Sequence, residues 1–248
     1  MRFTMTKFLI IFLFFFPSLL LADAYPPLRV AVAANFINAM ETIAPPFTAK
    51  YDIKIQPAYG SSGKLYAQMT NGSPYDLFFS ADYNRPKLLH EQGICEKPFA
   101  YASGSVVLWS WDTEIKGDIW QEVLLAGKGK IAIANPATAP YGKKGFEAIQ
   151  KAGLVDTANS RLVYGQSVGQ TFVFVQTGNT QMGFIALSQA LSKQGQKGKH
   201  WVIPEAEHIN QWGCVNKKSK NRAAAELLLS FLSTDDTKKT LNSLGYRQ

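Results

Sequence analysis

The chain repeats one local pattern along most of its length: a short apolar run, a small polar turn, and a segment with helical spacing. Alternation of strand-like and helix-like segments is typical of an α/β fold. The pattern forms two blocks, and a longer strand-like run at residues 101–109 lies between them. We therefore predict two lobes with a cleft between them. The first lobe is placed at residues 25–102 and completed by 218–248, and the second at residues 103–217.

The expected strands and helices follow from these runs. Residues 28–33 form the first strand, and Asn35 is positioned to cap the helix after it, whose apolar face extends from Ile37 to Phe47. Pro45-Pro46 should break or kink this helix, because proline removes a backbone hydrogen bond. Further strands are expected at residues 53–55, 77–79, 131–134 and 182–186, and further helices at 81–92, 141–152, 169–177, 187–192 and 221–232.

The N-terminus has the three parts of a secretory signal peptide. Arg2 and Lys7 form a basic start, residues 8–16 are apolar, and Ala22-Asp23-Ala24 fits an A-x-A cleavage site. A retained membrane anchor is the alternative, but the apolar run is well short of the ~20 residues that a spanning helix needs. We therefore expect residues 1–24 to be a signal peptide that is cleaved before Tyr25.

Cys95 and Cys214 are the only two cysteines. An even pair in an exported chain favours one disulfide, because the compartment is oxidising. Two free thiols remain the alternative at this point.

The chain is basic, with a formal net charge of +8. Its lysines are spread along the sequence, and no nucleic-acid-binding motif appears, so a nucleic acid is not the expected partner. The positive charge fits the steering of small anions, or solubility alone.

Four small polar turns precede helical segments. A helix N-terminus offers unpaired N–H groups and a partial positive charge, so several such turns in one cleft would bind an anion without a charged side chain. Each turn alone could serve only as a helix cap. The four turns are Ala33-Ala34-Asn35, Gly60-Ser61-Ser62-Gly63, Ala139-Pro140-Tyr141-Gly142 and Gln166-Ser167-Val168-Gly169.

An enzyme is the alternative of a different class. Ser61 and Lys64 fit the S-x-x-K motif of penicillin-recognising enzymes, which would make the chain a periplasmic serine hydrolase. The partner motifs S-D-N and K-T-G are missing, and Gln176-Thr177-Gly178 is the nearest match to the second. The sequence therefore favours a protein that is not an enzyme.

Other catalytic or metal-binding arrangements find little support. The three histidines lie in polar surroundings, where solvated surface positions are expected rather than a Ser/His/Asp triad, and the histidines and two cysteines show no metal-ligand spacing. Asp82 is expected to cap the helix that follows it, because a carboxylate in an anion site would repel the ligand. The three histidines are His90, His200 and His208.

Taken together, these turns and their neighbours resemble the periplasmic molybdate-binding proteins of ABC transporters. The resemblance extends in order from about Leu28 to Tyr246. It is carried by the segments Val30-Ala31-Val32-Ala33-Ala34-Asn35-Phe36, Gly60-Ser61-Ser62-Gly63, Tyr66-Ala67-Gln68, Asn71-Gly72-Ser73-Pro74-Tyr75-Asp76-Leu77-Phe78-Phe79-Ser80-Ala81-Asp82, Ala139-Pro140-Tyr141-Gly142 and Ser167-Val168-Gly169-Gln170.

The resemblance implies a two-lobed periplasmic binding protein fold, in which each lobe is a sheet flanked by helices and the ligand lies between the lobes. It places the oxyanion contacts at Ala34, Asn35, Ser62, Tyr141 and Val168. Asn35 and Ser62 would offer side-chain and backbone donors, whereas Tyr141 and Val168 would offer backbone N–H groups. Ala34 stands where such proteins usually have a Ser or Thr hydroxyl, so one donor is missing.

The resemblance also implies the function. The chain would be a monomeric periplasmic receptor that captures molybdate or tungstate and delivers it to an ABC transporter permease in the inner membrane. Molybdenum or tungsten would enter only as the bound oxyanion, through the same residues, and no cofactor is expected. A receptor for sulfate or another oxyanion on the same fold is the alternative binding function.

Overall fold

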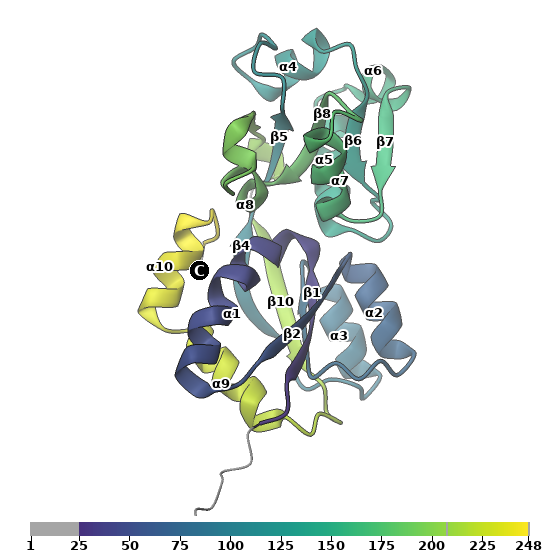
Figure 1. Cartoon of the computed structure of the whole chain (residues 1–248). Helices are drawn as coiled ribbons and strands as arrows, with labels where there is room; N and C mark the ends of the chain where they lie inside the picture. Colours follow the sequence, from purple (N-terminus) through teal and green to yellow (C-terminus); the bar gives the residue numbers. More distant parts are fainter. Residues whose placement is uncertain (1–24, 207, 248) are drawn as a thin grey trace, which may run out of the picture.

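The computed structural model describes residues 25–206 and 208–247, so the expected signal peptide at residues 1–24 lies outside the described residues. Two lobes lie one above the other in Figure 1, and each is built on a five-stranded sheet with helices packed against it. The expected two-lobed α/β fold is confirmed. Within the described residues, no helix is both long and apolar enough to cross a membrane.

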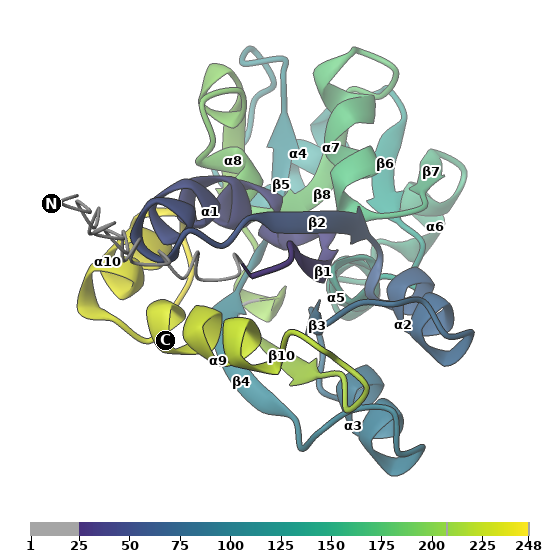
Figure 2. The ribbon, with the colours of Figure 1, turned by 60° about the horizontal axis from the view of Figure 1, so that its bottom comes forward.

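The first lobe contains five strands and five α-helices of the described residues. They are β1 (Leu28–Ala33), α1 (Ile37–Tyr51), β2 (Ile55–Gly60), α2 (Ser62–Thr70), β3 (Leu77–Ser80), α3 (Asn84–Glu91), β4 (Phe99–Gly104), β10 (Ile209–Val215), α9 (Arg222–Leu232) and α10 (Asp235–Ser243). The strand order is β2-β1-β3-β10-β4, with β1 parallel to β2 and β3, and β10 antiparallel to β3 and β4. Helices α1, α9 and α10 lie on one side of this sheet, and α2 and α3 on the other (Figure 2).

The second lobe is formed by one continuous stretch of chain. Its elements are β5 (Val106–Ser110), α4 (Trp120–Ala126), β6 (Ile131–Ala134), α5 (Pro140–Lys151), α6 (Val155–Asn159), β7 (Leu162–Gly165), α7 (Val168–Gln176), β8 (Met182–Ala186), α8 (Leu187–Ala190), η2 (Gly195–Lys197), β9 (Lys199–Val202) and η3 (Pro204–Ala206). The strand order is β7-β6-β8-β5-β9, in which β6 is parallel to β7 and β8. Helices α5 and α7 pack on β6 and β8.

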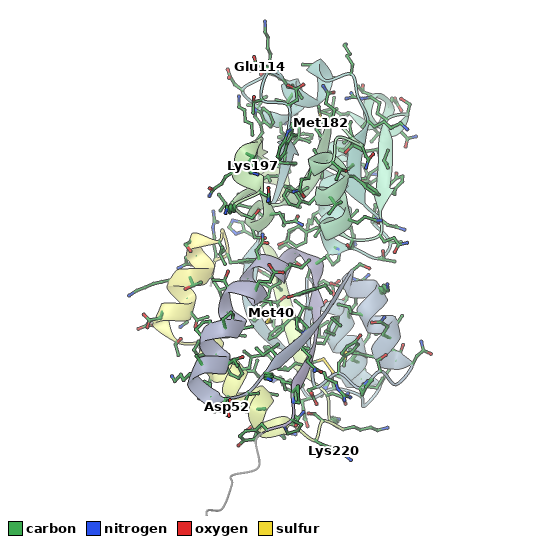
Figure 3. The ribbon with its side chains drawn as sticks, in the orientation of Figure 1. Met40, Asp52, Glu114, Met182, Lys197 and Lys220 are labelled. Carbon is green, nitrogen blue, oxygen red and sulfur yellow. A yellow bond between two sulfur atoms is a disulfide. The ribbon has the colours of Figure 1, made fainter. Side chains whose placement is uncertain are left out.

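Each lobe has its own apolar core. In the first lobe, the ring of Phe36 contacts the rings of Tyr101 and Tyr246, with centroids 5.1 and 5.2 Å apart. In the second lobe, Trp120 packs on Phe184 with ring centroids 6.0 Å apart. Figure 3 shows Met40 within the first lobe and Met182 within the second. Each lobe therefore has an apolar core, and the core of the second lobe extends to Ala33, Ala34 and Ala81 of the first.

The lobe boundaries differ from the sequence-based expectation in two places. The run at 101–109 was expected as one strand, but the chain forms β4 and β5 on either side of Ser105, and the two strands belong to different sheets. The return to the first lobe was expected at 218, but β10 already pairs with β3 and β4 of the first sheet. Strand partners lie far away in sequence, so local patterns could not place this crossover.

The expected break at Pro45-Pro46 is wrong, because α1 continues through both residues to Tyr51. Both prolines lie on the exposed side of the helix, where water can reach the carbonyl groups that lose their N–H partners. Met40, Ile43 and Phe47 are buried on the opposite side. Tertiary packing of that face therefore holds the helix together.

The predicted disulfide between Cys95 and Cys214 is present, with the two Cα atoms 5.8 Å apart. It joins the segment after α3 to β10 and is visible as a yellow bond in the first lobe in Figure 3. The bond therefore connects two parts of the same lobe that are 119 residues apart in sequence.

Candidate functional site

The four polar turns lie at the carboxyl ends of parallel strands. In the first lobe, β1 leads into the short 3-10 helix η1 (Ala34–Phe36), and β2 leads into α2. In the second lobe, β6 leads into α5 and β7 into α7. Helix α7 lies against η1 at the boundary between the lobes, as Figure 1 shows. Ligands of open α/β sheets bind beyond the carboxyl ends of strands, so this boundary is the candidate site.

The five expected contact residues all lie buried at this boundary. Ala34, Asn35, Ser62, Tyr141 and Val168 are each no more than 4% exposed. Ala34 of the first lobe belongs to the same packed cluster as Tyr141 and Val168 of the second. That cluster also contains Ala81, whose N–H donates to Ser62 Oγ at 2.9 Å. The structure therefore brings the four turns together.

Direct hydrogen bonds hold the two lobes in contact. Gly63 N donates to Thr138 O at 2.9 Å, and Asn38 Nδ2 donates to Ser188 O at 2.9 Å. Ser188 Oγ donates to Asn35 O, also at 2.9 Å. A Cβ atom at Gly63 would lie 2.9 Å from Thr138 O, so only glycine permits this approach without a shift. The boundary is thus a specific interface between the lobes.

The helix starts at this boundary provide neutral donors. Ser61 caps α2 by accepting from Lys64 N, and Ser167 caps α7 by accepting from Gln170 N at 3.3 Å. Tyr141 and Val168 lie in the first turns of α5 and α7, where N–H groups have no intrahelical acceptor. Ser62 Oγ accepts from Ala81 N, so its own hydroxyl hydrogen is available to a ligand.

The boundary contains buried hydroxyl groups that stay neutral. Burial raises the pKa of Tyr141 and Tyr101 well above the usual value, and it also raises the pKa of Tyr246. Tyr246 OH donates to Asn35 O at 2.5 Å. These groups therefore carry no charge at neutral pH, and their dipoles remain fixed by hydrogen bonds.

The model of the bacterial extracellular solute-binding protein family matches residues 28–247 of the chain. The chain belongs to this family.

Two molybdate-binding proteins ModA are similar to this solute-binding protein over most of its length. The protein of Rhodobacter capsulatus is 38% identical over 220 residues, which cover 87% of this chain and 86% of the relative. The protein of Azotobacter vinelandii is 35% identical over 224 residues, which cover 88% of each chain.

Solved structures agree with this assignment. The periplasmic molybdate-binding protein of Azotobacter vinelandii has a TM-score of 0.83 at 35% identity and covers 89% of this chain and 99% of its own. The sulfate-binding protein SubI of Mycobacterium tuberculosis has a TM-score of 0.74 at 18% identity and covers 90% of this chain and 86% of its own. The second likeness concerns the fold alone.

Asn35 was expected to cap the helix after β1, but the structure gives its side chain other partners. Its side chain makes no capping bond, and Nδ2 instead donates to Gln211 Oε1 at 2.7 Å. The sequence interpretation missed Gln211, Ser188 and Tyr246, which all contact Asn35. A glutamine within the apolar run around β10 was the one local signal for Gln211.

Ser61 of the S-x-x-K motif has a structural role in this solute-binding protein. Ser61 Oγ accepts the N–H of Lys64 as the cap of α2, and the Lys64 residue is exposed. Asp82 accepts from Arg85 N at 3.0 Å at the start of α3 and also pairs with the Arg85 guanidinium. In the part of the chain that the structure describes, no group of three or more His, Cys, Asp and Glu residues could hold a metal ion.

Proposed function

We propose that this solute-binding protein is a periplasmic receptor that captures molybdate, or its near equivalent tungstate, and delivers it to an ABC permease of the inner membrane. The observation that carries the proposal is the convergence of four helix starts, with neutral donors, at one buried boundary between the lobes. The similarity to two molybdate-binding proteins of 38% and 35% identity supports the choice of ligand.

The proposed contacts combine side-chain and backbone donors. Ser62 donates its hydroxyl and Asn35 its side-chain amide from the first lobe. Tyr141 and Val168 donate backbone N–H groups from the second lobe, and Ala34 contributes a backbone N–H only. Molybdenum enters as the oxyanion, and no cofactor takes part. Charge-assisted hydrogen bonds of this kind contribute about 1.5–3 kcal/mol each, so a few suffice for tight binding.

Binding and closure of the lobes are linked in this proposal. Donors from both lobes reach one anion only when the lobes are in contact, as they are through Gly63 and Thr138. A ligand that interacts better with the closed arrangement shifts the population toward it. The closed protein then docks on the permease, and no bond of the ligand is made or broken, so the role is not enzymatic.

Selectivity follows from the same geometry. We propose that the closed lobes select by anion size, and that a site lined by donors disfavours an anion that carries its own proton. Sulfate is the second candidate ligand, because it is also a tetrahedral oxyanion that neutral donors can bind. We further propose that residues 1–24 are a signal peptide cleaved before Tyr25 and that the mature protein is a monomer.

Isothermal titration calorimetry with molybdate, tungstate, sulfate and phosphate tests this function. We expect binding of molybdate and tungstate with similar affinity, and binding of sulfate that is weaker by at least roughly a hundredfold. Tighter binding of sulfate would instead assign the alternative receptor function. Covalent labelling of Ser61 by a serine-reactive β-lactam, with no binding of any oxyanion, would support the hydrolase.

A further inference from the structure

Gln211 connects the proposed anion contacts of the two lobes. It is fully buried in β10, where the pairing with β4 shifts register between Gln211 and Trp212. Its Oε1 accepts from Asn35 Nδ2 at 2.7 Å, and its Nε2 donates to Tyr141 OH at 3.1 Å. A bulge changes the direction of a strand's side chains, so this irregularity fits a residue that is aimed at a site.

The space for this contact is kept open by a glycine. A Cβ atom at Gly104, the last residue of β4, would lie 2.1 Å from Tyr141 OH and 2.9 Å from Gln211 Nε2. Any other residue there would displace one of the two groups. The contact between Gln211 and Tyr141 is therefore built into the packing of the boundary.

The Asn35 amide has one atom without a partner. Its Nδ2 is bonded to Gln211 and lies 3.4 Å from Tyr246 OH, whereas its Oδ1 is buried with no hydrogen-bond partner among the described residues. A buried acceptor without a partner costs about 1–3 kcal/mol. A fully deprotonated oxyanion cannot relieve this cost, because two acceptors repel each other.

Rotating the side-chain amides of Asn35 and Gln211 by half a turn exchanges their nitrogen and oxygen atoms. This exchange removes the unpartnered acceptor on Asn35. Gln211 Nε2 then donates to Asn35 Oδ1 and to the Tyr101 hydroxyl, which is now 2.9 Å from Gln211 Oε1 and has Ser80 O as its own acceptor at 3.1 Å. Tyr141 OH donates to Gln211 Oε1. The unpartnered position on Asn35 becomes an N–H donor, which a fully deprotonated anion can accept.

We propose that Gln211 is a positioning residue that sets anion selectivity by fixing which end of the Asn35 amide faces the ligand. The inference rests on the proposed function, because it takes Asn35 as a contact of the bound anion. When Gln211 donates to Asn35, the site presents a donor and favours molybdate. When Gln211 accepts from Asn35, the site presents an acceptor and suits an anion that carries a proton, such as hydrogen phosphate.

The first variant is Gln211→Met, which keeps the length of the side chain and removes its hydrogen bonds. Asn35 can then turn freely, so we expect the ratio of the phosphate Kd to the molybdate Kd to fall by roughly tenfold. Gln56→Met is the matched control on the exposed part of β2 and should leave the ratio unchanged. Equal weakening of both anions in Gln211→Met would overturn the inference.

The second variant is Gln211→Glu, measured between about pH 6 and about pH 8.5. A carboxylate only accepts, so Asn35 must donate to it and molybdate binding should weaken by roughly a hundredfold or more at the upper end. Protonation lets the same side chain donate, and burial raises the pKa of a carboxylic acid into this range. We therefore expect roughly tenfold recovery toward pH 6. Normalising to the parent protein at each pH cancels protonation of the anion.

The ionisable groups that face Gln211 should not titrate between about pH 6 and about pH 8.5. The ionisable groups that face Gln211 from β4, α5 and the C-terminal segment are Tyr101, Tyr141 and Tyr246, and burial raises the pKa of all three. Asp82, which acts on Tyr101, is paired with Arg85. A flat pH profile for Gln211→Glu would contradict the inference alone, whereas a parent protein that does not bind molybdate would contradict the proposed function.

Discussion

The two lobes contribute to the candidate site in different ways. In the proposed site, the first lobe would offer the side chains of Asn35 and Ser62, which are held by hydrogen bonds to Gln211 and to Ala81. The second lobe would offer backbone N–H groups of Tyr141 and Val168 in the first turns of α5 and α7, where both side chains are buried. Side-chain substitutions should therefore affect binding strongly at Asn35 and Ser62 and weakly at Val168.

The lobes also differ in how their chain is assembled. The second lobe is continuous from β5 to β9, whereas the first combines residues before β5 with β10 and the C-terminal helices. The disulfide joins these separated parts of the first lobe. The disulfide is thus found in the first lobe, whose two parts must be brought together across a long stretch of chain.

Blocking the contact between the lobes should have the largest effect on molybdate binding. Gly63→Val places a side chain against the Thr138 backbone, where even a Cβ atom would lie 2.9 Å from the carbonyl oxygen. The lobes cannot then close, and the molybdate Kd should rise by roughly a hundredfold or more. Small-angle scattering with ligand should show an open molecule.

Gly60→Ala is the control for this variant, because its Cβ would make an ordinary contact 3.4 Å from Leu65 Cγ. It should bind molybdate as the parent does. If Gly63→Val also binds like the parent, closure through this contact is not needed.

The disulfide should stabilise mainly the lobe that contains it. Replacing both Cys95 and Cys214 by Ala should lower the free energy of unfolding by about 2–4 kcal/mol, because the unfolded chain gains freedom. Hydrogen exchange should accelerate in β3, β4 and β10, with smaller changes in β6 and β8. Equal acceleration in both sheets would show that the lobes unfold as one unit.

Removing a side-chain donor should weaken molybdate binding more than shortening a side chain whose residue offers only a backbone donor. Ser62→Ala removes a hydroxyl donor and should weaken molybdate binding by roughly ten- to a hundredfold. Val168→Ala keeps its backbone N–H and should change the Kd by less than roughly threefold. Calorimetry on both variants, with His90→Ala as an unrelated control, measures the difference. A larger loss in Val168→Ala would reverse the assignment of roles.

Surface charge should give the smallest effect. Lys143 is exposed and Lys144 is partly buried in the first turn of α5, where Lys144 Nζ is 3.2 Å from Glu147. Replacing both by Gln should lower the association rate about two- to threefold and leave the dissociation rate unchanged, because exposed charges steer anions without holding them. Stopped-flow fluorescence at low and high salt measures both rates.

The control pair is Lys218 and Lys220, both exposed; Figure 3 labels Lys220 at the end of the first lobe away from the second. Its replacement by Gln should leave association nearly unchanged. A marked rise in dissociation for the Lys143 and Lys144 variant would place a lysine in contact with the anion.

The sequence predicted those parts of the fold that depend on neighbouring residues. Strands such as β1 and β6, and the turns that carry Ser62 and Val168, follow from short patterns of apolar and small polar residues. Pro45-Pro46 gave a wrong expectation, because packing of the opposite face of α1 outweighs the local effect of proline.

The rest of the site depends on contacts between distant residues. Gln211 bonds Asn35 across 176 positions, and Tyr246 does so across 211. The crossover of β10 to the first sheet, which brings Gln211 to the boundary, is likewise set by strand pairing. No local pattern encodes such partners, so the positioning residues became apparent only in the folded chain.

Neutral donors from both lobes are proposed to hold one molybdate at the boundary between them. A crystal structure of the protein grown with molybdate, with anomalous data at the molybdenum absorption edge, tests this proposal directly. We expect one strong peak between the lobes, with ligand oxygens about 2.7–3.2 Å from Ser62 Oγ and from the backbone nitrogens of Tyr141 and Val168. A peak bound to histidine or carboxylate side chains, or to one lobe only, would contradict it.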